Sequence, residues 1–225
     1  PNPIKVNHRF CENKNHLSKY FSGVAYDIQN IAEKTLVHLG KEIYKSVKSK
    51  NICLAGGVAL NSVANKKLID NSNFKNIFVF PACSDAGISF GAALWGAFNL
   101  IKDIKRSSLS FDNAYTGKEY TNKQVLDLFK KFKIKYSKKN NYKIAKYIAD
   151  KKIVGRCSGR SEYGPRALGN RSILADARSK KMRDYLNLRV KHREVFRPFA
   201  PVVLEENNKE YFDLKQSSPF MLLVA

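Results

Sequence analysis

The chain has 225 residues, of which 44% are hydrophobic and 12% are aromatic. That composition is enough to build a packed core, and it excludes an intrinsically disordered or low-complexity chain. The formal net charge is +22, from 41 basic and 19 acidic residues, which is typical of proteins that bind nucleic acid or an anionic membrane. A solvated, lysine-rich surface would give the same charge, so the net charge alone selects no partner.

The cysteines and the apolar stretches bear on the location of the protein. Four cysteines are far apart in sequence, lack the spacing of a zinc site and are too few for a disulfide framework. No secretory signal follows Pro1, and the longest apolar stretch, 86–101, is shorter than the roughly twenty residues of a membrane span. We therefore expect a cytoplasmic protein without a membrane partner.

The arginines are concentrated in one part of the chain. Nine of the 11 lie between Arg156 and Arg197, and only four acidic residues share that span. Arginine binds phosphate or carboxylate through two parallel hydrogen bonds, which lysine cannot do. We interpret the lysine excess as a solvated surface and the arginine cluster as an anion site, with a network of salt bridges as the alternative.

The first part of the chain alternates between helices and strands. Residues 1–20 are polar and are expected to form a loop. Apolar periodicity and glycine breaks then predict a helix over 21–47, a strand over 51–55, a helix over 60–69, a strand over 76–80 and a helix over 86–100. This order is an α/β pattern, in which ligands commonly bind at the ends of the strands.

The second part begins after a polar segment, 103–120, that we interpret as a linker between domains. The patterns beyond it predict helices over 122–131, 142–150, 180–189 and 205–212, and strands near Ile134 and over 152–156, 172–175, 199–204 and 220–225, with a long loop over 157–171. Because the chain stops inside the last apolar run, we expect more sequence to follow it.

Two short segments follow the predicted strands of the first part. Gly56 and Gly57 come directly after a buried strand, where backbone amides and a helix N-terminus can approach an anion, although a purely structural turn is the alternative. Asp85 follows the second strand, at the position of a helix N-cap. Its carboxylate is also a ligand type that suits a hard metal ion at the mouth of the sheet.

Two basic segments follow in the second part. The stretch 159–172 holds three glycines, a proline and three arginines, which predicts a shaped, cationic loop. The stretch 187–201 carries Lys191, Arg193 and Arg197 among aromatic residues and prolines, and we interpret it as a second wall of the same anion pocket. A pairing of Arg166 with Glu162 that only holds the loop in shape is the alternative.

Four stretches together resemble a known family. They are AGGVALN, the Pro81–Asp85–Gly87 block with its GAA run, GRSEYGPRALGNRSILAD and KHREVFRPFAP. The chain resembles the NodU/CmcH carbamoyltransferases over nearly its whole length. The resemblance implies an α/β fold of two domains: part of a TsaD-like domain of the actin-like (ASKHA) ATPase fold over 1–104, a linker over 105–120, and a YrdC-like α/β domain over 121–225.

The resemblance also implies an O-carbamoyltransferase. The YrdC-like domain of such an enzyme converts carbamoyl phosphate and ATP to carbamoyl-adenylate, and the TsaD-like site transfers the carbamoyl group to a hydroxyl of a small-molecule or sugar acceptor. A homodimer is left open, and a nucleic-acid partner is not expected. The matching positions are Gly56, Gly57, Val58 and Asn61 for nucleotide, Asp85 for metal, and Arg160, Arg166, Arg171, Lys191, Arg193 and Arg197 for carbamoyl phosphate and nucleotide.

The cofactors implied in this way are ATP and a divalent metal, expected to be iron. The family's metal-binding histidines lie upstream in an HHxxH motif that His8 and His16 do not reproduce, so we expect these ligands outside this chain, in a longer protein. The alternatives are a relative of the threonylcarbamoyl-adenylate pathway of tRNA modification and a nucleic-acid-binding module without catalysis. An upstream HHxxH motif would favour the enzyme.

Overall fold

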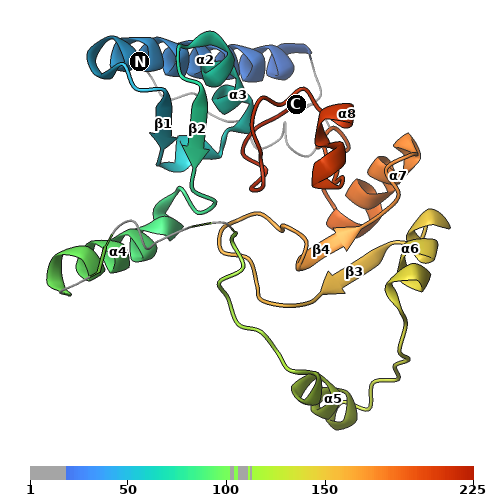
Figure 1. Cartoon of the computed structure of the whole chain (residues 1–225). Helices are drawn as coiled ribbons and strands as arrows, with labels where there is room; N and C mark the ends of the chain where they lie inside the picture. The colour runs from blue at the N-terminus through green and yellow to red at the C-terminus, as the bar shows by residue number, and fades with distance from the viewer. Residues whose placement is uncertain (1–18, 102–103, 106–110, 112) are drawn as a thin grey trace. The chain divides into compact units, whose positions relative to one another are not determined.

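The computed structural model describes residues 19–101, 104–105, 111 and 113–225 (Figure 1). The chain divides into two compact units, of which the first ends at Val79 and the second begins at Phe80. The loop expected over 1–20 lies outside the described residues except for its last two positions. Part of the expected linker over 105–120 also lies outside them, so the division into domains stays a prediction.

The described part of the first unit contains two helices and a two-stranded parallel sheet. Its elements are α2 (Lys19–Val47), β1 (Asn51–Leu54), a 3₁₀ turn (Gly57–Leu60), α3 (Ser62–Asn71) and β2 (Asn76–Val79). Ile52 of β1 lies opposite Ile77 of β2. The helices and strands predicted between residues 21 and 80 are therefore confirmed, with ends that differ by a few residues.

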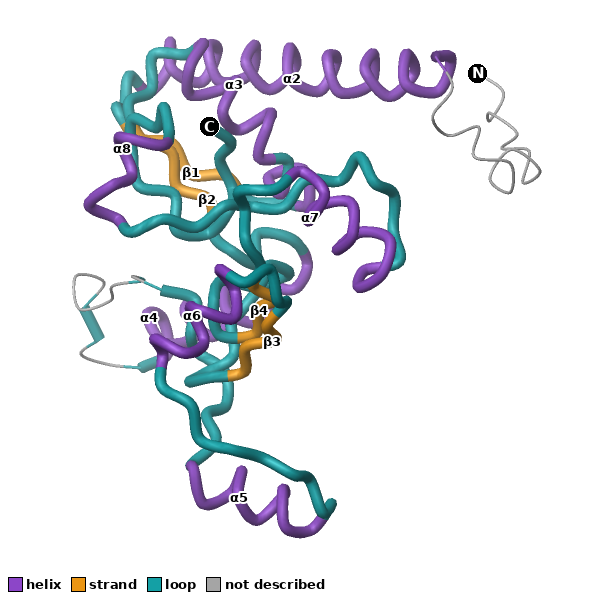
Figure 2. The backbone as a smooth tube through the Cα atoms, turned by 90° about the vertical axis from the view of Figure 1, so that its right-hand side faces the viewer, coloured by secondary structure: helices purple, strands orange, loops and turns teal. Residues whose placement is uncertain are grey.

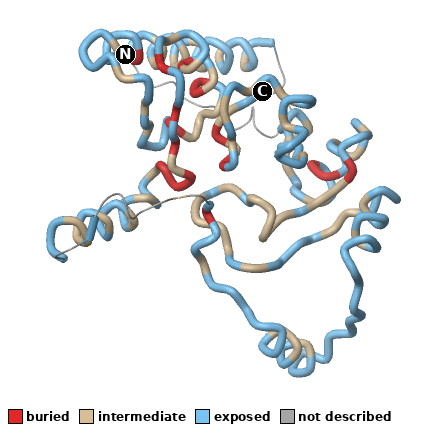
Figure 3. The backbone as a smooth tube through the Cα atoms, in the orientation of Figure 1, coloured by how far each residue is buried: buried red, intermediate tan, exposed pale blue. Residues whose placement is uncertain are grey.

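The core of the first unit forms around α3 and β2 (Figure 3). Leu68 of α3 is fully buried, and Ile77 and Val79 of β2 are each 5% exposed. Phe74, in the turn before β2, is buried and contacts Tyr44 of α2 edge to face, with ring centroids 5.5 Å apart. The alternation of buried and exposed residues along β2 is typical of a strand with one face against a core.

In the described part of the second unit, two of the helices begin with a side-chain cap. The helices there are α4 (Ile88–Leu100), α5 (Asn122–Lys131), α6 (Asn141–Ala149), α7 (Lys180–Tyr185) and α8 (Asn208–Tyr211). Thr121 and Gln124 form a reciprocal capping box at the start of α5, and the Asn140 side chain accepts from the Lys143 N–H at the start of α6. These caps define the first residues of α5 and α6, which apolar periodicity alone locates only to within a few residues.

The helix α7 continues into a wider turn, and α8 is preceded by a tighter one. A π-helical turn, Leu186–Lys191, prolongs α7, and a 3₁₀ turn, Glu205–Asn207, precedes α8. Together with these turns, the helices predicted for 122–131, 142–150, 180–189 and 205–212 are confirmed.

One antiparallel pair of strands lies in the second unit. β3 (Val154–Cys157) pairs with β4 (Arg171–Leu174), so that Val154 lies opposite Leu174 and Cys157 opposite Arg171 (Figure 2). The pair confirms the strands predicted over 152–156 and 172–175, and it closes the loop between them at its base. The described residues therefore form a mixed α/β structure with two small sheets.

Three other predicted strands are wrong within the described residues. At 199–204, Pro201 has no amide hydrogen to donate, and Val202 is 84% exposed. At 220–225, Met221 has a φ of 56°, a left-handed conformation that interrupts an extended strand. The third predicted strand lay near Ile134. There, the N–H of Ile134 donates to the Phe129 carbonyl at 2.8 Å and closes the last turn of α5.

Two helices expose large apolar side chains. Ile28 and Ile31 of α2 are each 64% exposed, and Ile88 and Trp95 of α4 are 68% and 63% exposed. α4 is almost entirely apolar, yet none of its residues is buried. Among the helices that the structure describes, none combines the length and the apolar character required to cross a bilayer.

Candidate functional site

The predicted nucleotide loop is an open turn at the carboxyl end of β1. Gly56 has φ 101° and ψ 160°, a conformation that a residue with a Cβ adopts only under strain. A Cβ added at Gly56 or Gly57 would meet no atom within 4 Å, and the Val58 side chain is 67% exposed. The turn therefore leaves room for an external group above its backbone, as the resemblance requires.

Asn61, the fourth residue predicted to bind nucleotide, has a structural role in the first unit. Its Oδ1 accepts from the Ala64 N–H at 3.1 Å, so it caps α3. Its Nδ2 donates to Oε1 of Gln29 on α2 at 2.8 Å. The sequence analysis did not single out Gln29, and because its partner is 32 positions away, no local pattern could have done so.

Asp85 stands in the first turn of a short 3₁₀ helix, Asp85–Gly87, and is exposed. The N-cap position belongs to Ser84, so the expectation that Asp85 caps the helix is corrected by one residue. The Ser84 carbonyl accepts from the Gly87 N–H at 2.8 Å, which closes the turn without the carboxylate. Capping therefore does not use the Asp85 side chain.

The described residues do not supply a metal site of their own. Within them, no group of three or more His, Cys, Asp or Glu side chains comes together. Asp85 would therefore contribute one ligand, and the others would have to come from outside the described residues. The metal stays an expectation of the family.

The arginine-rich loop between β3 and β4 is organised by a carboxylate. Oε1 of Glu162 accepts from three backbone N–H groups, those of Leu168 at 2.9 Å, Asn170 at 2.7 Å and Arg171 at 3.1 Å. Glu162 thus holds the loop in shape, as the alternative interpretation supposed, but it does so through backbone amides. We call residues 159–171 the Glu162 loop.

The same contacts set the charge state of this carboxyl. Burial raises the pKa of Glu162, but N–H groups of Leu168, Glu162 itself, Arg171 and Asn170 lower it, and the net shift is downward. The carboxylate is therefore ionised at neutral pH.

Arg171 closes the base of the Glu162 loop. Its Nη1 donates to the carbonyls of Ser158 at 2.9 Å and Asn170 at 3.0 Å, and its Nη2 donates to the Gly159 carbonyl at 3.1 Å. Three donors of the guanidinium group are thus engaged in joining the two ends of the loop. Arg171 therefore has a structural role in the loop, apart from any role in binding an anion.

The second basic segment is organised by a neutral side chain. Asn187, in the π-helical turn, is fully buried. Its Nδ2 donates to the carbonyls of Arg197 at 2.9 Å and Val195 at 3.3 Å, and its Oδ1 accepts from Nε of Arg193 at 2.7 Å. Asn187 therefore fixes the backbone of residues 187–198, which we call the Asn187 segment.

Two predicted anion ligands in the Asn187 segment also have protein partners. The Arg193 guanidinium donates to the Pro198 carbonyl at 3.3 Å and lies 4.7 Å from the ring centroid of Phe199. Nε of Arg197 lies 2.9 Å from a carboxylate oxygen of Glu194. Parts of both guanidinium groups are thus committed within the segment.

The other three predicted anion ligands are Arg160, Lys191 and Arg166. The side chains of Arg160 and Lys191 are exposed, and neither makes a hydrogen bond or ion pair with another described residue. Arg166 is half-buried, and its charge acts on the thiol of Cys83. Burial raises the pKa of that thiol, and the positive charge of Arg166 opposes the rise.

Two further arginines of the cluster, Arg178 and Arg183, form salt bridges, as the alternative interpretation of the cluster supposed. The carboxylate of Asp176 accepts from Nε, Nη2 and the backbone N–H of Arg178 at 2.9 to 3.1 Å. These bonds hold the pKa of Asp176 down to about 2. The arginine cluster is therefore part salt bridge and part structural support, and only some of its members are open to a ligand.

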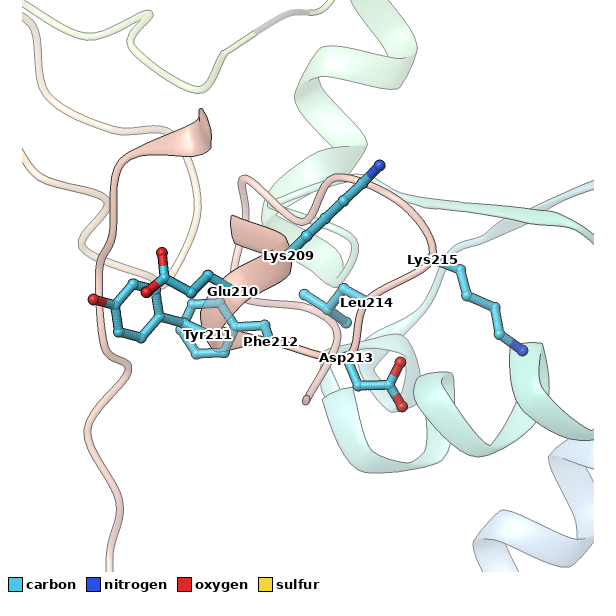
Figure 4. Close-up of a pocket in the computed structure, with 7 residues that line it drawn as sticks. All are labelled: Lys209, Glu210, Tyr211, Phe212, Asp213, Leu214 and Lys215. Carbon is cyan, nitrogen blue, oxygen red and sulfur yellow. The ribbon is translucent and has the colours of Figure 1, made fainter. Parts of the chain in front are cut away.

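A surface hollow in the second unit is lined by none of the predicted site residues (Figure 4). It is lined by one continuous stretch, Lys209, Glu210, Tyr211, Phe212, Asp213, Leu214 and Lys215. Because these residues adjoin one another along the chain and carry charges of both signs, the hollow gathers no chemistry from distant parts of the sequence. We assign it no function.

Comparison with known proteins gives two matches to family models. Residues 3–94 match the model described as "Carbamoyltransferase N-terminus", and residues 145–225 match "Carbamoyltransferase C-terminus". Asp85 and the glycine turn fall within the first match, whereas the Glu162 loop and the Asn187 segment fall within the second.

Several curated proteins are similar to the chain over most of its length. An uncharacterized protein of Synechocystis sp. is 42% identical over 90% of this chain and 34% of its own length. Nodulation protein NolO of Bradyrhizobium diazoefficiens is 39% identical over 90% of this chain and 38% of its own length. Nodulation protein U of Rhizobium fredii is 36% identical over 77% of this chain and 28% of its own length. The chain thus spans about a third of the length of these relatives.

Proposed function

The chain belongs to the carbamoyltransferase family, since that family's N-terminal and C-terminal models both match it, and from this premise we propose that its protein is an O-carbamoyltransferase. In this proposal the donor is carbamoyl phosphate, ATP activates it, and the acceptor is a hydroxyl of a small molecule or sugar. We keep the predicted division of labour, with activation at the YrdC-like part and transfer at the TsaD-like part.

One observation carries the proposal. Glu162 is the only acidic residue of the Glu162 loop, and one of its carboxylate oxygens is occupied by backbone N–H groups. The exposed guanidinium of Arg160 has no ion pair within the described chain. A loop built in this way presents fixed positive charge, and arginine does so without losing its proton.

The chemistry needs that charge because both substrates are polyanions. Carbamoyl phosphate, ATP and one water molecule give carbamoyl-adenylate, inorganic phosphate and pyrophosphate. The acceptor oxygen then attacks the carbamoyl carbon, the bond to the adenylate oxygen breaks, AMP leaves, and the hydroxyl proton passes to solvent. We propose that Arg160, Arg166 and Lys191 bind phosphate oxygens during activation, while Arg171, Arg193 and Arg197 mainly hold the surrounding backbone in place.

We propose that the predicted nucleotide loop contacts the nucleotide. The turn at Gly56 and Gly57 would approach nucleotide phosphates with its backbone N–H groups. Asn61 would keep this turn in place by capping α3, since both of its polar side-chain atoms already have partners in the first unit.

Pyrophosphate release tests the activation step. We expect the full-length protein to release pyrophosphate from ATP when carbamoyl phosphate is present, without any acceptor. Acetyl phosphate and inorganic phosphate serve as controls, because they carry similar charge but no carbamoyl group. Pyrophosphate release that does not depend on carbamoyl phosphate would contradict the proposal.

A further inference from the structure

Tyr163 of the Glu162 loop contacts the turn that carries Asp85. Its hydroxyl donates to the carbonyl of Ala86, the residue that follows Asp85. The same hydroxyl lies 3.1 Å from Oγ of Ser89, in the first turn of α4. At the other end of the residue, the Tyr163 N–H donates to the Ala114 carbonyl at 2.7 Å. Tyr163 is therefore tied at both its backbone and its hydroxyl.

The next residue brings the two backbones together. Gly164 has a φ of 113°, and a Cβ added there would lie 2.7 Å from the Pro81 carbonyl oxygen. Real Cβ atoms do not approach that closely, so only glycine fits between the loop and the segment that leads to Asp85. The loop and this segment are thus in direct contact within the second unit.

Aromatic rings surround the contact. The Tyr163 ring lies 5.7 Å from that of Phe80 and 6.2 Å from that of Phe90, and the Phe80 and Phe90 rings stack at 4.9 Å. Phe111 joins the same cluster. The ring of Tyr163 therefore packs among the phenylalanines, and its hydroxyl remains a separate, removable element of the contact.

From these contacts we infer that Tyr163 is a positioning residue that joins the Asp85 turn to the Glu162 loop, so that an anion bound by the arginines also orders the turn that carries Asp85. This inference rests on the proposed function, because it takes Arg160 and Arg166 as ligands of carbamoyl phosphate. It adds a link between the segment matched by the N-terminal family model and the loop matched by the C-terminal one.

Tyr163→Phe removes the hydroxyl and keeps the ring. Tyr115→Phe is the matched control, because the Tyr115 hydroxyl donates to the Leu168 carbonyl at 2.7 Å in the same loop. Both variants lose one hydrogen bond to a carbonyl, and Tyr163→Phe also loses the contact with Oγ of Ser89, so we expect small losses of thermal stability that are somewhat larger in Tyr163→Phe. Hydrogen–deuterium exchange of the full-length protein, followed by mass spectrometry, would report on residues 82–90 and 159–171 with and without carbamoyl phosphate.

We expect carbamoyl phosphate to slow exchange over 159–171 in the wild type and in both variants. Over 82–90, we expect the same slowing in the wild type and in Tyr115→Phe, and its loss in Tyr163→Phe. Slowing over 82–90 that persists in Tyr163→Phe would overturn the inference. If carbamoyl phosphate slows exchange in neither segment of the wild type, the proposed function fails. Without ligand, faster exchange over 82–90 in Tyr163→Phe than in Tyr115→Phe would still support the contact itself.

Discussion

The Glu162 loop and the Asn187 segment are both basic, but their backbones are ordered by side chains of different kinds. In the loop, an ionised carboxylate accepts from three backbone N–H groups. In the segment, a neutral amide donates to two carbonyls and accepts from one arginine. Asn187 is fully buried and Glu162 is half-buried. A neutral amide can be buried completely once its hydrogen bonds are made, whereas a buried carboxylate also carries the cost of removing a charge from water.

The comparison shows that a cluster of arginines is not one functional unit. Arg171 completes the base of the Glu162 loop, and Arg193 completes the bonds of Asn187. Arg160 and Lys191 make no such contact within the described chain. Since a guanidinium group that binds backbone carbonyls has fewer donors left for phosphate, the two kinds of residue should respond differently to substitution.

The largest effect is expected from Asn187→Leu. This substitution removes three side-chain hydrogen bonds and leaves their partly buried partners unsatisfied. Chemical denaturation should show a loss of roughly 2–4 kcal/mol in the free energy of unfolding. Asn187→Asp keeps the acceptor for Arg193 but turns a charged oxygen toward two carbonyls in a fully buried site, so it should lose at least as much. A loss below about 1 kcal/mol in Asn187→Leu would mean that these hydrogen bonds contribute little.

A smaller effect, on binding, is expected from Arg160→Gln. If Arg160 binds a phosphate oxygen, titration calorimetry should show that the affinity for carbamoyl phosphate falls about ten- to a hundredfold, or about 1.5–3 kcal/mol. Lys191→Gln tests whether the Asn187 segment shares the anion, and an unchanged affinity would confine binding to the Glu162 loop. Arg183→Gln is the control, because Arg183 pairs with Asp184 on an exposed face.

The smallest effect is expected from Glu162→Gln, with a loss of roughly 1–2 kcal/mol in unfolding free energy, since charge-assisted hydrogen bonds become neutral ones. The pKa of Glu162 is lowered in the folded chain. Its contribution is therefore present above the usual glutamate pKa and is lost as the pH falls through the folded value. The difference between the wild type and Glu162→Gln should shrink in acid, whereas the effect of Asn187→Leu should persist.

Glu194→Gln is the control for this pH effect. Its carboxylate pairs with Arg197, and its side chain is 39% exposed. Such a partly exposed ion pair contributes at most about 1 kcal/mol. A loss from Glu194→Gln as large as that from Glu162→Gln would show that the backbone amides give Glu162 no special importance.

Local sequence signals identified most helices and the paired strands. The run of apolar residues in 21–47 and the Gly56–Gly57 break act over a few positions, so each can be read without the rest of the chain. The predicted strands at 199–204 and 220–225 failed because an apolar run does not specify a partner. Pro201 and the left-handed Met221 remove the extended, hydrogen-bonding backbone that pairing requires.

The motifs by themselves determined the family and the set of candidate residues. Only the tertiary structure decided how those candidates divide, because it depends on partners that are distant in sequence or invisible as motifs. Glu162 binds backbone amides, Asn187 binds backbone carbonyls, and the Tyr163 hydroxyl reaches a carbonyl 77 positions away. Apart from proline, which lacks an N–H, every position carries the same backbone groups, so nothing in the residue letters marks which of them a side chain will meet.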